Sequence, residues 1–279
     1  RLMSFKISLA GDLGSGKSTV GKILSRKLGA EVYSTGTIQR QIATEMGMTT
    51  LQLNQYMETH PEIDGKIDDG LRALEHSEKN LIIDSRMAWH FVPSSFSVYM
   101  AADPFVSAER ILKAGRESEP FSTVEEAVAS ISDRRKSEMF RYSHLYGVNI
   151  KDLENYDYVI DTSYIPPETV AEHIAVHFEL HRAGKQYPRY ELCPARLLPC
   201  LNGEGEPAFF EQDGFYFIAQ GERKIAAAIR AGAPLVSCDR AQGEYGEECA
   251  KKHCTSDKIA AWERETGAKI ARLPAWLKR

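Results

Sequence analysis

The stretch AGDLGSGKSTVGK, residues 10–22, restricts the fold of this chain more than any other part of the sequence. Gly11 is followed by four residues and then by Gly16-Lys17-Ser18, a spacing that matches the P-loop template. Residues 5–9 have the pattern of a strand before the glycines, and apolar side chains recur at helical spacing over residues 20–28. The stretch therefore predicts a strand, a phosphate-binding loop and a helix in direct succession.

Glycines let such a loop adopt backbone angles that other residues avoid, so that successive N–H groups converge on an anion at the positive end of a helix. The template predicts that Lys17 reaches the β- and γ-phosphates and that the Ser18 hydroxyl binds magnesium. The nucleotide-binding residues expected from the loop are Gly11, Gly14, Ser15, Gly16, Lys17, Ser18 and Thr19. A glycine-rich turn without a ligand is the alternative, and the complete template in this context disfavours it.

Strand-like and helix-like segments alternate along residues 1–181. This alternation favours an α/β fold with a parallel sheet covered by helices on both faces. The predicted strands are 5–9, 31–33, 80–84, 96–100 and 156–161, and the predicted helices are 37–46, 50–77, 104–115, 123–142 and 167–180. Ligands on such sheets bind at the carboxyl ends of the strands. The P-loop, residues 34–36 and residues 84–86 all follow predicted strands, so one cleft is expected to collect them.

Composition excludes several classes of protein. The formal net charge of −4 over 279 residues gives no general attraction to nucleic acid or to anionic membranes. No apolar run is long enough for a transmembrane helix, and no secretory signal pattern precedes the P-loop. All five cysteines follow residue 192, and in a chain without an export signal they are expected to be reduced thiols in the cytoplasm. Cys249, His253 and Cys254 fit no standard zinc spacing, so packed or solvated thiols are favoured over a metal site.

Residues 181–199 bring a glycine, three prolines and the first cysteine, which indicates a linker into a second unit. The expected domains are therefore 1–181 and 187–279. Aromatic residues around Asp213-Gly214 predict a hairpin over 207–220, and an alanine-rich helix is expected to follow.

The first unit resembles the cytidylate kinases, chiefly their compact archaeal-type branch. The resemblance runs in order through residues 4–178 and rests on YSTGTIQRQIA, YMETHPEIDGKIDDG, LIIDSRMAWH, FSVYMAADPFVSAERI and DRRKSEMFRYSHLYGVNIKDLENYDYVIDTS. It implies a P-loop core with an insertion that binds a nucleoside monophosphate and a closing lid. It also implies transfer of the γ-phosphoryl group of ATP to CMP or dCMP with Mg²⁺. A small-metabolite kinase on the same scaffold and a nucleotide sensor with little turnover are the alternatives.

The resemblance assigns roles to residues beyond the P-loop. The substrate-binding residues that it implies are Ser34, Thr35, Gly36, Arg40, Arg86, Arg134, Glu138 and Arg141. The catalytic residues that it implies are Lys17, Arg110, Arg116, Arg134 and Arg141. The spacing of Arg134, Glu138 and Arg141 also puts all three on one helix face, which is expected to point into the cleft.

Other positions of the first unit leave alternatives open. Asp84 ends a strand and is a candidate metal ligand beside Ser18, with a structural capping role as the alternative. Arg135 and Lys136 lie off the Arg134 face and are expected to be solvated. Asp12 replaces a small or proline residue common in this family. Met87 stands where some bacterial members carry an aspartate that helps select cytosine, which leaves the base preference open.

The segment FIAQGERKIAAAIRAG resembles the Gly-Glu-Arg-Arg box of ParB-like and sulfiredoxin-like domains, over about residues 187–240. The resemblance implies a small α+β domain whose box holds nucleotide phosphates at a helix N-terminus. The matching residues are Gly221, Glu222, Arg223 and Lys224. A helix start with a basic turn and no ligand is the alternative. No helix-turn-helix pattern follows, so the expected partners are small nucleotides and not a specific DNA site, and the oligomeric state stays open.

Overall fold

The computed structural model describes residues 4–115 and 121–277, and the chain divides into two compact units between Gln186 and Tyr187. The expected end of the first unit, residue 181, falls in the last turn of helix α8 (Pro167–Arg182). Each unit has its own core and is described by itself.

A parallel sheet with strand order β2-β3-β1-β4-β5 forms the centre of the first unit. Its strands are β1 (Lys6–Gly11), β2 (Glu31–Ser34), β3 (Leu81–Asp84), β4 (Phe96–Ala101) and β5 (Tyr158–Asp161). β3, β4 and β5 are buried along their whole length, as a sheet covered on both faces requires. The strands predicted for this unit are confirmed to within a few residues.

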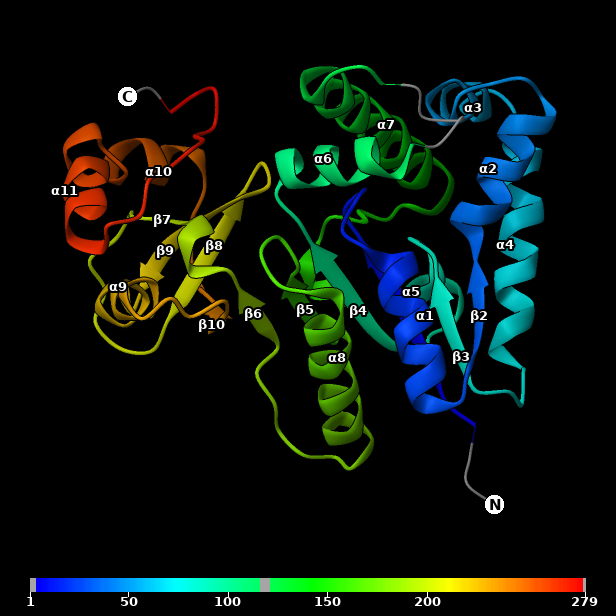
Figure 1. The fold of residues 1–279 in the computed structure, drawn as a ribbon, viewed down its shortest axis with the longest axis horizontal. Coiled ribbons are helices and arrows are strands. Elements are labelled where there is room, and N and C mark those ends of the chain that lie inside the picture. The colour runs from blue at the N-terminus through cyan, green and yellow to red at the C-terminus, as the bar shows by residue number, and fades with distance from the viewer. Residues whose placement is uncertain (1–3, 116–120, 278–279) are drawn as a thin grey trace. The chain divides into compact units, whose positions relative to one another are not determined.

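Helices cover both faces of this sheet. They are α1 (Lys17–Leu28), α2 (Thr35–Glu45), α3 (Thr50–Met57), α4 (Pro61–Glu75), α5 (Ala88–Phe91), α6 (Pro104–Ala114), α7 (Val124–Tyr146) and α8. On one face α1 packs beside α8 (Figure 1). Gly21 of α1 lies against Ile82 of β3. On the other face Leu81 and Ile83 enter a core with α4, α5 and α7. Successive side chains of a strand point to opposite faces of the sheet, so Ile82 faces the α1 side while Leu81 and Ile83 face the opposite side.

The single helix predicted over 50–77 is wrong, because the structure has two helices there. His60 precedes a proline and adopts φ −129° and ψ 68°, outside the helical region. The proline ring disfavours helical angles at the residue before it. Pro61 then starts α4, at a position where its missing N–H costs no hydrogen bond. The break lets α2, α3 and α4 fold around one small core that includes Leu53 and Ile67.

The second unit contains a mixed sheet with strand order β6-β10-β8-β9-β7. Its elements are β6 (Tyr190–Leu192), β7 (Leu197–Leu198), β8 (Ala208–Gln212), β9 (Phe215–Gln220), α9 (Glu222–Arg230), β10 (Val236–Arg240), α10 (Glu247–His253) and α11 (Ser256–Thr266). β8 and β9 form the predicted hairpin. Asp213 and Gly214 both have positive φ, 53° and 81°, as a tight hairpin turn requires.

The cysteines are free thiols, and four of them are buried. Among the described residues, no group of three His, Cys, Asp or Glu side chains is arranged to hold a metal ion. Within the same residues, no helix is long and apolar enough to span a membrane.

Candidate functional site

The P-loop turns sharply between β1 and α1, and two of its glycines have no room for a side chain. Gly11 has φ 136°, and a Cβ there would lie 2.2 Å from the carbonyl oxygen of Met100. At Gly14, with φ 74°, a Cβ would lie 2.6 Å from the carbonyl oxygen of Ser107. Any other residue at these positions would therefore displace the loop from β4 or from α6.

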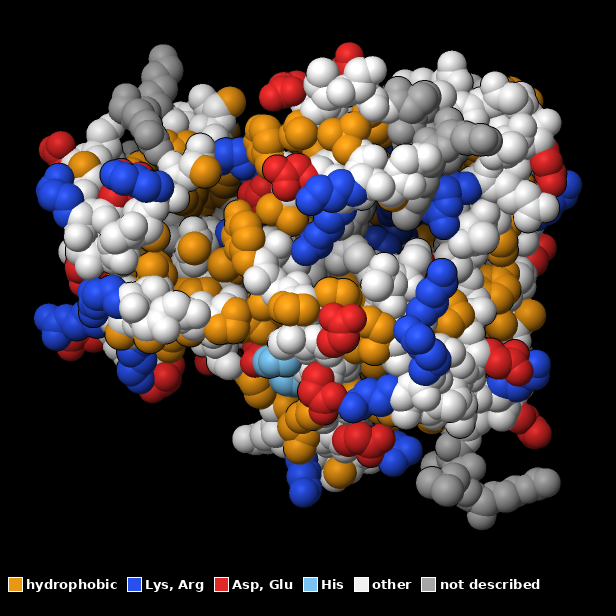
Figure 2. All heavy atoms as spheres, in the orientation of Figure 1, with side chains coloured by type: hydrophobic (Ala, Val, Ile, Leu, Met, Phe, Trp, Pro, Cys, Tyr) orange, Lys and Arg blue, Asp and Glu red, His pale blue; other side chains and the backbone are white. Residues whose placement is uncertain are grey.

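The loop borders a cavity of about 330 Å³. The predicted site residues that line the cavity are Gly14, Ser15, Gly16, Lys17, Ser18, Thr19, Thr35, Gly36, Arg40, Asp84, Arg86, Arg110 and Arg134. Lys and Arg side chains surround a hollow where α1, α2 and α6 meet (Figure 2). The residues gathered here come from strand ends and helix starts that lie far apart in the sequence, as the α/β interpretation expects.

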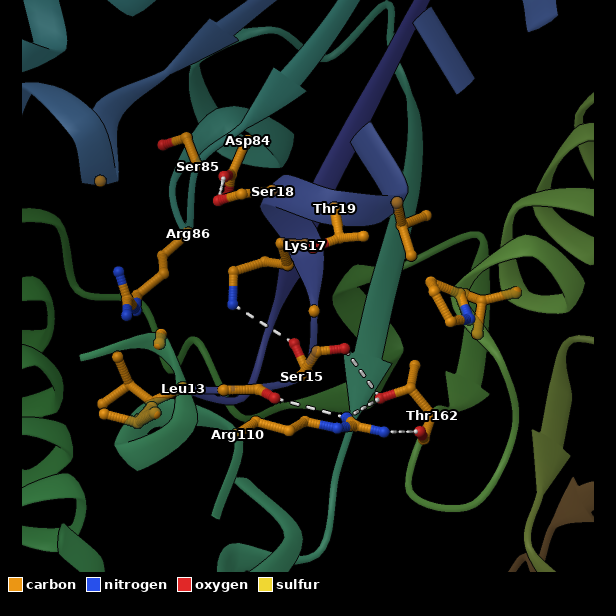
Figure 3. Close-up of a pocket in the computed structure, with 18 of the residues that line it drawn as sticks. Leu13, Ser15, Lys17, Ser18, Thr19, Asp84, Ser85, Arg86, Arg110 and Thr162 are labelled. Atoms are coloured by element: carbon orange, nitrogen blue, oxygen red, sulfur yellow. Dashed lines mark hydrogen bonds between the residues drawn. The ribbon is translucent and has the colours of Figure 1, made fainter. Parts of the chain in front are cut away.

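Lys17, the lysine of the P-loop, lies folded over its own loop (Figure 3). Lys17 Nζ donates to the main-chain oxygen of Asp12 at 2.7 Å and to Ser15 Oγ at 3.4 Å. Burial and the neighbouring Arg86 guanidinium lower the pKa of Lys17 to about 8. The ammonium group is thus held in the cavity wall by neutral oxygens, which an anionic ligand can replace.

Ser18 and Asp84 place two hard oxygen donors side by side. Ser18 Oγ donates to Asp84 Oδ2 at 2.9 Å, and Ser34 Oγ donates to the same oxygen at 3.2 Å. Mg²⁺ prefers oxygen ligands and takes few from protein, because it keeps waters and substrate phosphates. The donor set of Ser18 and Asp84 therefore fits this ion. Asp84 also has a structural contact, because Ser34 caps α2 by accepting a hydrogen bond from Thr37 N.

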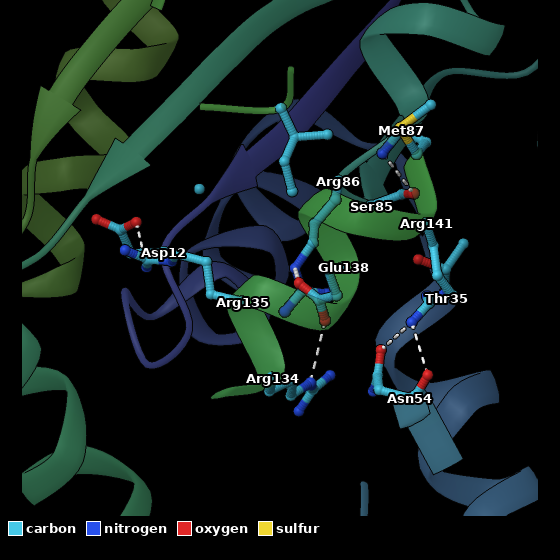
Figure 4. A network of polar contacts seen from close by, with 12 residues as sticks. Asp12, Thr35, Asn54, Ser85, Arg86, Met87, Arg134, Arg135, Glu138 and Arg141 are labelled. Atoms are coloured by element: carbon cyan, nitrogen blue, oxygen red, sulfur yellow. Dashed lines mark hydrogen bonds and ion pairs between the residues drawn. The ribbon is translucent and has the colours of Figure 1, made fainter. Parts of the chain in front are cut away.

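A buried carboxylate holds two arginines at the wall of the cavity (Figure 4). Glu138 Oε2 lies 2.6 Å from Arg86 Nε, and Glu138 Oε1 lies 3.1 Å from Arg134 Nε. Burial by itself raises the pKa of Glu138, but the guanidiniums of Arg86 and Arg134 outweigh it and lower the pKa. Glu138 does not line the cavity itself, so its contact with the cavity is through the two arginines.

The spacing of Arg134 and Arg141 predicted that both point into the cavity. Arg134 lines the cavity, but Arg141 does not. Arg141 is 2% exposed and donates to Asp64 Oδ2 at 3.0 Å and to Asn54 Oδ1 at 2.9 Å. These contacts join α7 to α4 and α3. The expected shared face exists only in part, and a substrate role for Arg141 stays a prediction.

Two further arginines lie on the cavity wall. Arg110 donates to the main-chain oxygens of Thr162 at 2.6 Å and Gly14 at 3.4 Å, which connects the P-loop to the segment after β5. Arg40 donates to Thr37 Oγ1 at 3.1 Å on α2. Arg116 lies outside the described residues.

Two expectations near the site, for Arg135 and Lys136, have clear outcomes. Arg135 is not solvated, because it is partly buried and pairs with Asp12 at 2.6 Å. Lys136 is exposed, as predicted. Met87 is 2% exposed and packs in the core beside α5, so it does not line the cavity. Two predicted residues that do not line the cavity lie beside it in the fold: Ser34 caps α2, and Gly11 is the last residue of β1.

The second unit has a cavity of its own, of about 770 Å³. Gly221, Glu222, Arg223 and Lys224 all line it, together with residues of α11. Lys224 pairs with Glu206, and Arg223 lies 3.9 Å from Glu204. The basic side chains are thus balanced by nearby carboxylates.

Comparison with known proteins relates the first unit to characterised families. A sequence profile described as an AAA domain matches residues 7–130. The cytidylate kinase of Sulfolobus acidocaldarius is 41% identical over 169 residues, which cover 60% of this chain and 90% of that protein. The cytidylate kinase of Thermoplasma volcanium is 38% identical over 170 residues, which cover 60% of this chain and 87% of that protein. This chain belongs to the cytidylate kinase family.

Membership of the cytidylate kinase family confirms the resemblance predicted for the first unit, and these matches cover the N-terminal part of the chain. A third relative, the S-adenosylmethionine-dependent nucleotide dehydratase of Lacinutrix mariniflava, is 35% identical over 187 residues. That match covers 67% of this chain, and the chain spans only 38% of the length of the dehydratase. The ParB-like resemblance of the second unit stays a prediction.

Proposed function

We propose that this protein transfers the γ-phosphoryl group of ATP to a nucleoside monophosphate, with CMP or dCMP as the acceptor. The products are ADP and CDP or dCDP. One observation carries the proposal: Lys17 and Ser18 of the P-loop border the same cavity as the arginines at 40, 86 and 134. A triphosphate and a second phosphate therefore have cationic partners in a single space.

The donor nucleotide binds at the P-loop. Backbone N–H groups at the start of α1 face its phosphates, and Lys17 exchanges its contacts with Asp12 and Ser15 for phosphate oxygens. Ser18 and Asp84 would hold Mg²⁺, which would neutralise charge on the phosphates. Arg110 keeps the far side of the loop fixed.

The acceptor phosphate binds opposite the P-loop. Guanidiniums suit this task because they are planar, permanently charged forks. Arg40 comes from α2, whereas Arg86 and Arg134 are held in place by Glu138. Phosphoryl transfer depends mainly on alignment and charge neutralisation, so no general base is assigned.

The decisive experiment measures ATP consumption with Mg²⁺ against CMP, dCMP, UMP, AMP, GMP, serine and no acceptor. The proposal expects rapid turnover with CMP or dCMP. The variant Lys17→Ala is expected to lower kcat/KM by about a hundredfold or more, because it removes a cation from the transferring phosphates. Turnover with serine alone would support a small-metabolite kinase instead. Tight ATP binding without turnover on any acceptor would support a nucleotide sensor.

A second proposal concerns the second unit, where all the residues of the Gly-Glu-Arg-Lys segment line one cavity. We propose that this cavity binds a nucleotide or another small phosphate at the start of α9. Titration of the whole protein with ATP, CDP and inorganic phosphate tests it, with Lys17→Ala present to remove binding at the P-loop. The proposal is wrong if Arg223→Ala leaves every remaining affinity unchanged.

A further inference from the structure

Asp12, the unusual acidic residue of the P-loop, lies between Lys17 and helix α7. Its main-chain oxygen accepts a hydrogen bond from Lys17 Nζ at 2.7 Å. Its side chain extends the other way, and Oδ1 lies 2.6 Å from Arg135 Nη2 and 3.0 Å from Lys151 Nζ. One residue therefore contacts Lys17 through its backbone and α7 through its carboxylate.

The carboxylate is fully enclosed by donors. Tyr99 OH donates to Oδ1 at 2.7 Å, and the amide of Ala102 donates to Oδ2 at 2.9 Å. Lys151 also donates to Tyr99 OH at 2.8 Å, so Asp12, Tyr99, Arg135 and Lys151 form one group, which we call the Asp12 cluster. Burial alone would raise the pKa of Asp12, but Arg135 and Lys151 outweigh it and keep that pKa well below its usual range. The cluster thus keeps a charged carboxylate beneath the P-loop.

Arg135 reaches this cluster from the residue next to Arg134. Consecutive residues of a helix point about 100° apart, so the two guanidiniums leave α7 in different directions. Arg134 turns to the cavity and Glu138, whereas Arg135 turns to Asp12 (Figure 4). Holding Arg135 in place therefore sets the rotation of α7 about its axis, and its position along that axis, at the neighbouring Arg134.

We propose that Asp12 is a positioning residue for phosphoryl transfer, which through Arg135 ties the P-loop to α7 and sets Arg134 opposite Lys17. This inference rests on the proposed kinase function. The tie does not depend on the hydrogen bond from Lys17 to Asp12, which a bound phosphate replaces. Asp12 and Lys17 belong to the same short loop, and the Asp12 carboxylate holds Arg135 of α7. Arg134 then occupies its place before any nucleotide binds, and no reorganisation is needed during the reaction.

The experiment compares Arg135→Gln with Lys136→Met, each alone and combined with Arg134→Met. Lys136 is the matched control, because its side chain is 75% exposed and pairs with Asp133 on the same helix. Arg135→Gln is expected to lower kcat/KM for CMP about tenfold, and to lower it less than about twofold when Arg134 is already Met. Lys136→Met is expected to leave kcat/KM for CMP unchanged, both with Arg134 present and in the Arg134→Met background. Equal losses in both backgrounds, or a lower Tm with unchanged kcat/KM, would overturn the proposal.

Asp12→Asn is the direct variant, but it leaves Arg135 and Lys151 partly buried without their carboxylate and can unfold the chain. Arg135→Gln avoids this problem, because Lys151 still neutralises Asp12. Amide hydrogen exchange over residues 128–140, without nucleotide, supplies a readout independent of turnover. It is expected to be several times faster in Arg135→Gln than in Lys136→Met. Unchanged exchange refutes the tie even in an active kinase, whereas faster exchange in a protein without CMP turnover refutes only the proposed function.

Discussion

At the scale of single residues, the charged side chains of this site are arranged by burial as much as by attraction. Glu138 and Asp12 are almost completely enclosed, and each keeps its charge because two cations approach it. Removing the carboxylate leaves its two cations, which are themselves buried or partly buried, without their counter-charge, and this is costly. Changes at these carboxylates are therefore expected to affect folding and catalysis together, whereas changes at exposed pairs such as Lys136 with Asp133 are expected to affect neither.

Glu138→Gln tests how far one carboxylate organises the two cavity arginines. The variant keeps the size of the side chain but removes the charge that faces Arg86 and Arg134. Both guanidiniums are expected to lose their fixed positions, which should raise KM for CMP and lower kcat, with a combined loss in kcat/KM of about tenfold to a hundredfold. Steady-state kinetics with CMP and ATP varied separately measures the effect. An unchanged KM for CMP would contradict the role given to these arginines.

Asp68 provides a prediction on pH. It is 3% exposed on α4, accepts a hydrogen bond from Tyr146 OH, and its pKa is raised to about 7 by burial and by the charge of Asp64. A carboxyl whose pKa is higher in the folded than in the unfolded chain binds its proton more tightly when folded. Its contribution therefore favours folding at low pH and is lost as pH rises from about 4 to about 7.

Asp68→Asn replaces this group by a neutral one that also accepts a hydrogen bond. The variant is expected to be more stable than the natural chain at pH 8, by roughly 1–3 kcal/mol, and the difference should shrink towards pH 5. Urea unfolding at several pH values measures it. A difference that stays constant with pH would show that Asp68 does not titrate in this range.

At the scale of helices and strands, buried polar contacts join elements that the sheet does not connect. Arg141 links α7 to α3 and α4 through Asn54 and Asp64, with its side chain only 1% exposed. Arg141→Met is expected to destabilise the fold by about 3 kcal/mol, because Asp64 is left buried without its cation. Arg141→Met combined with Asp64→Asn should recover part of this loss. Equal destabilisation in the single and the double variant, measured by urea unfolding, would contradict the pairing.

The sequence could predict the parts of this structure that depend on local patterns, but not the contacts between residues far apart in the chain. Apolar runs identified the strands and the P-loop template identified the start of α1, because both patterns are local. Helical spacing placed Arg134 and Arg141 on α7 but gave no sign of their partners. Asp64 lies 77 positions before Arg141, and Asp12 lies 123 positions before Arg135. Which cation faces the cavity and which is buried is thus decided by tertiary packing that no local pattern contains.

At the scale of the whole molecule, every residue that lines the P-loop cavity belongs to the first unit. The Asp12 cluster and the contacts of Glu138 and Arg141 lie there as well. A chain that ends at Gln186 therefore contains all the side chains that the proposed reaction uses. It is expected to phosphorylate CMP with kcat/KM within about threefold of the full chain, since no cavity residue is removed.

Steady-state kinetics on this shortened chain, beside the full chain and its Arg223→Ala variant, separates two relationships between the units. If the shortened chain and the Arg223→Ala variant both keep full activity, the reaction needs only the first unit. A shortened chain that folds cooperatively but loses activity would contradict the assignment of the reaction to the first unit alone. If Arg223→Ala in the full chain reproduces that loss, occupancy of the second cavity acts on the P-loop site, since the substitution removes a cation from that cavity and leaves the P-loop cavity intact.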